Sequence, residues 1–298
     1  MQRISPNTLA TALFTALLLV PAARPSLAAC GSDANQVDAS CYNGDLQAAV
    51  RDALASDRPL FLPRGKYPIS QPLVIDYAAN ADTGFLLISD GATIDGTRIA
   101  KAPVLTVKCS GGTPAAPKSC FYFHQQGTLF VNGNSNTWAF ELGTDDFSDA
   151  HNSVKLDHLI VNNAGPWGAA LNYVLNADAF IVADSGDGPS DFHVGLALNQ
   201  VQFSTIRGAA SARNGWALWL GGGYTIANTI QGIDLEESLW CVVNDSRTSA
   251  RNTLISPYLN CRYSVMSSNG DGNMLLNPLF AGATAVPTQI SCGFKVMQ

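Results

Sequence analysis

Charged side chains are scarce in this sequence. Asp, Glu, Lys and Arg make up 13% of its 298 residues, against roughly 25% in typical globular proteins. Disordered chains and coiled coils need far more charge, so the composition excludes both classes. The formal net charge is −6, which argues against a nucleic-acid partner because phosphate binding requires a basic surface.

Patterns that bind metals or phosphates are also missing. There is no Cys-x-x-Cys pair, and the four histidines do not have the spacing of metal ligands. The acidic, glycine-containing loop 184–191 lacks the spacing of an EF-hand calcium loop. Neither a Gly-x-Ser-x-Gly elbow nor a phosphate-binding loop is present. We therefore predict a protein without a metal or another cofactor.

Only the N-terminus contains a long apolar run. Thr8–Val20 is too short to span a bilayer, and Ser26-Leu27-Ala28 has the small residues of a cleavage site. We interpret residues 1–28 as a signal peptide and residues 29–298 as a single domain that is secreted or periplasmic. The residues before Cys30 also fit the pattern of a lipidated cysteine, so a lipoprotein anchored at Cys30 is the alternative. We predict no membrane span.

Seven cysteines in an exported chain predict disulfides. Their positions favour two local pairs and one pair between neighbouring coils: Cys30–Cys41, Cys109–Cys120 and Cys241–Cys261. Cys292 is then left over, whereas lipidation of Cys30 would leave an even number. We interpret the cysteines as structural cross-links.

Asparagine recurs through the second half of the chain at intervals of 24, 23, 29, 24 and 21 residues. The repeating positions are Asn152, Asn176, Asn199, Asn228, Asn252 and Asn273. Between them, short segments such as Ile230–Leu235 alternate apolar and polar residues, which is typical of β-strands. Pro257 and Pro278 would break helices at the same place in two successive repeats. We predict a β-solenoid with regular coils over about 150–282 and the asparagines stacked at one bend.

The N-terminal part of the domain differs from the repeat. Residues 45–54 have helical spacing, and a solenoid needs a cover over its open end, so we predict a capping helix at about 44–56. Leu46–Val50, Leu60–Tyr67 and Pro72–Ile75 resemble the entry to right-handed parallel β-helix proteins of the pectate-lyase-like superfamily. Phage-tailspike-type depolymerases and relatives of family 28 glycoside hydrolases belong to this group.

The resemblance implies an all-β fold, a right-handed parallel β-helix (β-solenoid) with a short N-terminal capping helix, and a polysaccharide as partner. Tailspike relatives are often trimers, so the resemblance also allows a homotrimer. Asp145-Asp146 matches one polygalacturonase motif, but the Asn-Thr-Asp, Gly-His-Gly and Arg-Ile-Lys motifs are absent. Catalytic residues therefore cannot be transferred by motif.

The repeat itself locates a candidate site. Side chains alternate along a strand, so we expect positions six and eight residues after each asparagine to point outward. The polar residues at these positions include His158, Asp184, Arg207, Asp234, Glu236, Tyr258 and Asn260. On this register Arg207 lies between Asp184 and Glu236.

Two carboxyl groups at such a face would serve a glycosidase, which needs a separation of about 5–5.5 Å (retaining) or about 6.5–9.5 Å (inverting). We expect Glu236 to be the acid and Asp234 or Asp184 to be the base or nucleophile. Arg207 would keep one carboxylate ionised, or act as the base of a lyase. Such charges also form purely structural rows on solenoid surfaces.

The remaining expected contacts are with substrate. Trp216 and Trp219 lie beside a glycine-rich loop and offer apolar ring faces to a sugar. His158, Tyr258 and Asn260 complete the predicted substrate-binding set. The sequence thus predicts an exported carbohydrate-active enzyme that cleaves glycosidic bonds of a polysaccharide, as a hydrolase or a lyase. The alternative is a non-catalytic surface or assembly protein that binds polysaccharide.

Overall fold

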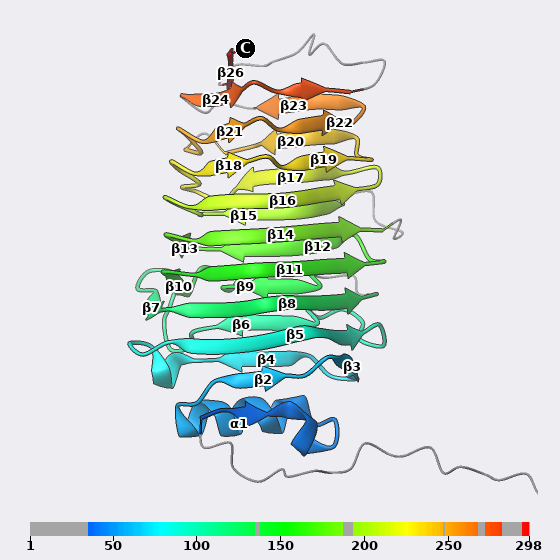
Figure 1. Cartoon of the computed structure of the whole chain (residues 1–298). Helices are drawn as coiled ribbons and strands as arrows, with labels where there is room; N and C mark the ends of the chain where they lie inside the picture. Colours follow the sequence, from blue (N-terminus) through cyan, green and yellow to red (C-terminus); the bar gives the residue numbers. More distant parts are fainter. Residues whose placement is uncertain are drawn as a thin grey trace, which may run out of the picture.

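The computed structural model describes residues 35–134, 138–186, 193–246, 248–267, 272–281 and 294–297. Over these ranges the chain winds into coils stacked along one axis, with the helix at one end and the C-terminus at the other (Figure 1). Neighbouring strands pair in parallel in each of three sheets. The predicted all-β parallel β-helix with a short helix is therefore confirmed.

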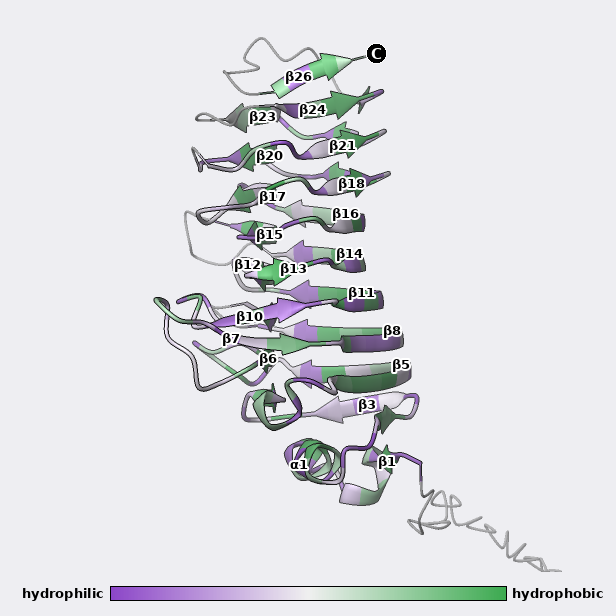
Figure 2. Ribbon diagram, turned by 90° about the vertical axis from the view of Figure 1, so that its left-hand side faces the viewer, coloured by the Kyte–Doolittle hydropathy of each residue, from purple (hydrophilic) through white to green (hydrophobic). Residues whose placement is uncertain are grey.

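The longest sheet contains 15 strands within the described residues. It faces the viewer in Figure 1 and forms one side of the stack in Figure 2. Its strands are β1 (Val37–Asp38), β2 (Leu60–Leu62), β3 (Gly65–Pro68), β5 (Phe85–Gly96), β8 (Phe123–Gly133), β11 (Lys155–Asn163), β14 (Asp178–Ser185), β16 (Thr205–Ala212), β18 (Thr229–Gln231), β19 (Asp234–Glu236), β21 (Thr253–Ile255), β22 (Tyr258–Asn260), β24 (Asn273–Leu276), β25 (Leu279–Phe280) and β26 (Phe294–Met297).

Two further sheets close the coils. The eight-stranded sheet contains β4 (Leu73–Asp76), β6 (Leu105–Lys108), β9 (Phe140–Leu142), β12 (Trp167–Asn172), β15 (Val194–Asn199), β17 (Trp216–Gly221), β20 (Trp240–Asn244) and β23 (Tyr263–Ser267). The three-stranded sheet contains β7 (Lys118–Phe121), β10 (Asp149–Asn152) and β13 (Val174–Leu175). Alternate side chains of the two larger sheets point inward and form one continuous apolar core.

Helix α1 (Leu46–Ser56) covers the open end of the first coils. Its buried residues Leu46, Ala49, Val50 and Ala53 have the spacing of one helical face. The Gln47 side chain bonds the edge strand β4 as another strand would, since its Nε2 donates to Val74 O and its Oε1 accepts from Val74 N, both at 3.0 Å. The short 3₁₀ turns η1 (Ala39–Tyr42) and η2 (Ala78–Asn80) complete this end.

Three of the six repeating asparagines form a continuous ladder at one bend. Nδ2 of Asn228 donates to Oδ1 of Asn252 at 2.9 Å, and Nδ2 of Asn252 donates to Oδ1 of Asn273 at 3.1 Å. The same Nδ2 groups also donate to backbone carbonyls of Val201 and Thr225. All three side chains are buried. The predicted stacking is confirmed for these three residues.

The other asparagines do not join this ladder. Ser204 takes the preceding place, because its backbone N–H donates to Oδ1 of the first ladder asparagine at 3.0 Å. Asn199 instead donates to Asn172 at the end of the eight-stranded sheet, at 2.8 Å. Asn176 donates to Asn152 at 3.0 Å. The prediction of one six-membered column is therefore wrong, since similar asparagine-containing segments lie at different bends.

Two predicted disulfides fall within the described residues, and both are present: Cys109–Cys120 and Cys241–Cys261. The second joins neighbouring coils, because Cys241 lies in β20, which pairs with β23 just after Cys261. Disulfides are typical of extracellular or periplasmic proteins. The predicted signal peptide, Cys30 and Cys292 lie outside the described residues. In the described part, no helix is long and apolar enough to cross a membrane.

Candidate functional site

A row of polar side chains runs along the outside of the long sheet, near the C-terminal ends of its strands. Each member follows a buried residue of the core, so strand alternation turns it outward. Consecutive members are register partners on neighbouring strands. This polar row consists of Asp95, Asn132, Asn162, Asp184, Ser211, Glu236 and Asn260.

Several members of the polar row are held by hydrogen bonds. Nδ2 of Asn162 donates to Oδ1 of Asn132 at 3.4 Å, and Oγ of Ser211 donates to Oδ1 of Asp184 at 2.7 Å. Asp95 is paired with Lys66 at 2.8 Å. The row therefore presents carboxylate, amide and hydroxyl groups in a fixed order, which suits a ligand with many hydroxyl groups.

Arg207 does not lie in this row. Ser211 occupies the place between Asp184 and Glu236, whereas Arg207 lies opposite Phe180 and is hydrogen-bonded to Asp178. The predicted Asp184–Arg207–Glu236 arrangement is therefore wrong. The prediction fails because it takes Asn199 as the start of the repeat, whereas Asn199 lies at a different bend from the ladder asparagines.

A cavity of about 630 Å³ opens beside the row, where the strands β5 to β16 end. Its polar lining residues are Thr97, Asn132, Asn162, Asn163, Asp184 and Arg213. Arg213 lines the same cavity as Asp184, and its Nε lies 4.0 Å from Oε2 of Glu237, the residue after Glu236, so a cation is present next to the row. The cavity is open to solvent, so an extended chain could lie across it without being enclosed.

Asp234 and Glu236 lie two residues apart on β19, which places their Cα atoms roughly 6–7 Å apart on the same face. Burial raises the pKa of Asp234, and its Oδ1 has no hydrogen-bond partner. The charge of Asp234, followed by burial and the charge of Glu237, raises the pKa of Glu236. Tyr258 lies opposite Asp234, and Asn260 lies opposite Glu236. Glu236 is thus biased towards the protonated form of a general acid.

The other predicted substrate-binding residues lie elsewhere. His158 is on β11, three strands from β19 and so about 14 Å away. It bonds Thr128 Oγ1 at 3.2 Å and packs edge-on against Phe180. Trp216 and Trp219 are on β17, in the eight-stranded sheet. The structure therefore brings Tyr258 and Asn260 beside the carboxylates, but not His158 or the tryptophans.

All five tryptophans of the chain belong to the outer side of the eight-stranded sheet. None is in the main core, and Trp138, Trp167, Trp216 and Trp219 form a separate cluster with Ala170, Val194 and Ala197. Residues in consecutive register along this side are Trp167, Val194, Trp216, Trp240 and Tyr263. We call these residues together with Trp138 and Trp219 the aromatic face.

Glu141 was not predicted, and it lies at the edge of the aromatic face, opposite Ala170. Only 8% of its surface is exposed. Burial, reinforced by the charges of Asp145 and Asp149, raises the pKa of Glu141 to about 8. Asn172 Nδ2 donates to its Oε1 at 3.2 Å. The apolar neighbours Phe140 and Leu142 were the signal in the sequence that this side chain turns outward.

A second buried polar network lies on the three-stranded sheet, whose β10 is hydrophilic in Figure 2. His151 Nδ1 is 2.7 Å from Tyr77 Oη, and Nε2 is 3.0 Å from Asp149 Oδ2. The backbone N–H groups of Cys109 and Thr144 also donate to Asp149. Burial opposes ionisation of Asp149, but these hydrogen bonds outweigh it and lower its pKa to about 2. The network is enclosed and therefore structural.

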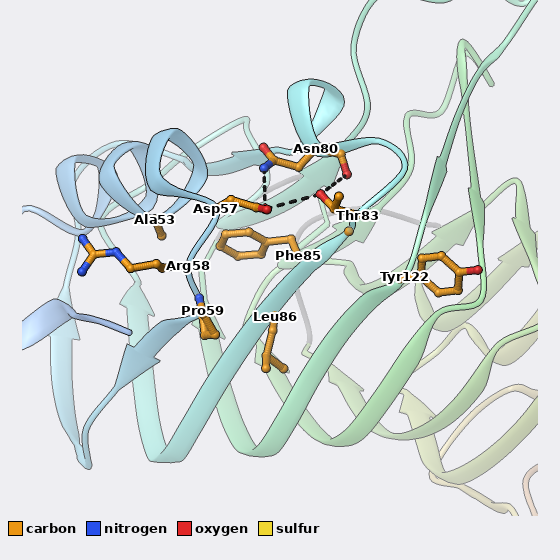
Figure 3. A pocket seen from close by; sticks show the side chains of 10 residues that line it. Ala53, Asp57, Arg58, Pro59, Asn80, Thr83, Phe85, Leu86 and Tyr122 are labelled. Atoms are coloured by element: carbon orange, nitrogen blue, oxygen red, sulfur yellow. Dashed lines mark hydrogen bonds between the residues drawn. The ribbon is translucent and has the colours of Figure 1, made fainter. Parts of the chain in front are cut away.

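A smaller cavity of about 250 Å³ lies between α1 and the first coils (Figure 3). Asp57 Oδ1 accepts hydrogen bonds from Asn80 Nδ2 at 2.8 Å and from Thr83 Oγ1 at 3.3 Å. These two bonds connect the C-terminal end of α1 to the coil, so the Asp57 carboxylate has a structural role. Within the described ranges, no three His, Cys, Asp or Glu side chains converge as metal ligands.

No protein-family model matches the chain, and no curated protein matches it. Its fold is similar to that of PfbA, a surface adhesin of Streptococcus pneumoniae, with 12% identity and a TM-score of 0.52 over 84% of this chain and 73% of PfbA. ORF18 of Geobacillus virus E2 gives 10% identity and a TM-score of 0.48 over 88% of this chain and 58% of ORF18. The catalytic domain of a GH87 α-1,3-glucanase in complex with nigerose gives 9% identity and 0.21 over 90% and 67%. The similarity to PfbA supports the fold alone.

Proposed function

We propose that the protein is a carbohydrate-active enzyme that cleaves glycosidic bonds of a polysaccharide lying along the polar row. The observation that carries this proposal is the alignment of Asp184, Ser211 and Glu236 on three consecutive strands, with Asp184 lining the adjacent cavity. Amide and hydroxyl side chains on both sides of these carboxyl groups would bind sugar hydroxyls.

In this proposal Glu236 is the general acid and Asp184 the general base. Two strand spacings separate their backbones by about 9–10 Å, near the upper end of the window of an inverting hydrolase. Ser211 donates to Asp184, as a partner of an ionised carboxylate does. The charge of Asp234 raises the pKa of Glu236, which favours the protonated form that a general acid needs. Glu236 would protonate the leaving oxygen while Asp184 activates a water molecule.

The test is the release of new reducing ends from a panel of bacterial exopolysaccharides and plant polymers. Glu236→Gln and Asp184→Asn should each lower the rate by at least about 100-fold, because general acid–base catalysis contributes about 10²–10⁴-fold. Asp178→Asn is the matched control, since Asp178 lies on the same strand as Asp184 and bonds Arg207 instead. Unchanged rates in both carboxyl variants would overturn the assignment. Unsaturated products, detected by ultraviolet absorbance, would indicate a lyase.

The second candidate is a non-catalytic polysaccharide-binding surface protein. The aromatic face favours it because binding needs no carboxyl pair, and PfbA, which shares the fold, is a surface adhesin. The two candidates differ in one measurement. A binding protein would release no product and would keep its affinity in Glu236→Gln.

A further inference from the structure

Aromatic rings on the outer side of the eight-stranded sheet form a track parallel to the axis of the solenoid. Five register partners span four strand spacings, or about 19 Å. Four of them are aromatic, namely Trp167, Trp216, Trp240 and Tyr263, and the buried Val194 lies between the first two. Trp138 extends the track, with its ring centroid 5.2 Å from that of Trp167. At the other end Tyr263 is 42% exposed and stacks on Trp240 at 4.6 Å. The track is therefore long enough for several sugar units of an extended chain.

Small side chains on the outer side of this sheet leave room for the rings to pack against it. Ala170, Val194 and Ala197 are completely buried and pack with Trp138, while Trp167, Trp216 and Trp219 pack against the same cluster and remain partly exposed. Indole and phenol rings have an apolar body and one polar group, so they suit a ligand that alternates C–H and hydroxyl groups.

Charge and hydrogen-bonding groups around the track indicate the chemistry of its ligand. Among the described outward positions of β9, β12, β15, β17, β20 and β23, Glu141 is the ionisable acid, and its raised pKa keeps it mostly uncharged at neutral pH. Beside the track Asn199 donates to Asn172, while Asn199 Oδ1 has no hydrogen-bond partner. Arg262 places one cation at the end of the track, because its guanidinium lies 5.5 Å from the centroid of the Tyr263 ring. The six strands themselves contain no Lys or Arg, so a uronate polymer would find no row of cations along the track, whereas a neutral polymer needs none.

We propose that the aromatic face binds an uncharged polysaccharide lengthwise, at a site separate from the polar row. The site lies on a different sheet from the carboxyl groups, so it does not depend on the proposed cleavage. In an enzyme it would hold the polymer during repeated cleavage. In an adhesin it would be the principal binding surface.

The test uses the whole mature chain in native gels that contain hydroxyethyl cellulose, dextran or mannan, with polygalacturonate as the charged comparison. We expect retardation by at least one neutral polymer and not by polygalacturonate. Trp216→Ala should weaken this retardation at least fivefold, and Trp216→Phe should keep most of it. Phe203→Ala is the matched control, because it removes an exposed aromatic ring that belongs neither to the aromatic face nor to the polar row. Binding at the aromatic face should also shift tryptophan emission, since every tryptophan lies on this face.

Three results would overturn this inference. One is the absence of both retardation and emission change with all neutral polymers. Another is equal retardation of wild type and a folded Trp216→Ala variant. The third is a concentration-dependent oligomer that Trp216→Ala dissociates, which would identify a second copy of the chain as the occupant. Retardation without any release of reducing ends would instead contradict the cleavage proposal alone.

Discussion

At the level of single residues, the surroundings of Glu236 connect the sequence most directly to the proposed catalysis. Asp234 contributes most to the raised pKa of Glu236, and the exposed Glu237 contributes a smaller part. Both are close in sequence, so strand geometry alone places two like charges near the proposed acid. Charge in the vicinity, more than deep burial, therefore biases Glu236 towards its protonated form.

Glu237→Gln should move the alkaline limb of the pH–rate profile to lower pH. Removing a negative charge lowers the pKa of Glu236, so the acid loses its proton earlier as the pH rises. The measurement is kcat/KM against pH for wild type and variant. Asp178→Asn, which changes a charge farther along the sheet, should leave the limb in place. An unshifted limb in Glu237→Gln would argue against Glu236 as the acid.

Glu141 links protonation to folding stability in the opposite sense from Asp149. Its pKa rises from the ordinary 4.5 to about 8 on folding, so the folded state binds more protons between these values. The contribution of Glu141 to the free energy of unfolding is therefore fully present below about pH 4.5 and is lost as the pH rises through about 8. Asp149, with its pKa lowered from 3.8 to about 2, stabilises above pH 4 and loses this contribution as the pH falls.

Glu141→Gln should therefore flatten the decline in stability between about pH 4.5 and 8. Glutamine keeps the shape of the side chain but has no proton to lose. Urea unfolding at a series of pH values measures this difference. As the pH rises, the free energy of unfolding of the variant should increase relative to that of wild type. A parallel decline in both proteins would contradict the raised pKa of Glu141.

Among the structural elements, the asparagine ladder fixes how successive coils meet at one bend. Asn252 uses both ends of its amide, since it accepts from Asn228 and donates to Asn273 and to Thr225 O. A buried amide in such a chain is fully satisfied only when both neighbouring coils are in place. The ladder therefore couples the coils, which strand pairing alone would leave free to slip.

Asn252→Ala should lower the free energy of unfolding by about 1–3 kcal/mol for each buried group left unpaired. Asn162→Ala, on the outer polar row, is the control and should cost less because water can replace the lost bond. Denaturant unfolding of the two variants compares them. Equal losses of unfolding free energy in the two variants would show that the ladder stabilises the fold no more than a surface hydrogen bond does.

At the scale of the whole molecule, the solenoid is sensitive at its ends, because a parallel sheet offers an unpaired edge there. Gln47 closes that edge at β4 through two backbone hydrogen bonds. The same construction separates two surfaces: the polar row on the long sheet and the aromatic face on the eight-stranded sheet. A single chain can thus carry both proposed carbohydrate sites independently.

Gln47→Ala should therefore loosen the attachment of α1 more than it affects the stack as a whole. Without the amide, the N–H and C=O of Val74 have no partner on the helix side. Hydrogen exchange should accelerate in β4 and α1, while β14 and β16 remain protected. Gln202→Ala, far from the cap, is the comparison. Uniform acceleration throughout the chain would contradict a local role for Gln47.

Much of the fold follows from local sequence. Alternation in segments such as Ile230–Leu235, prolines that forbid helical repeats, and the acidic start of α1 act over a few residues, so they are readable without a structure. The proximity of Asp234 and Glu236 follows for the same reason. Tyr258 and Asn260 were also placed correctly beside them, because the coils after Asn228 repeat regularly.

The sequence by itself determined that this chain forms stacked parallel strands with a helix over one end, because periodicity and capping are short-range properties. Only the tertiary structure decided which side chains meet across coils. One additional residue at the Gly232 bend shifts the register between β16 and the next coil, and Ser204 replaces an asparagine without altering the local pattern. Ser211 therefore lies where Arg207 was expected, and the tryptophans lie together on the outer side of the eight-stranded sheet.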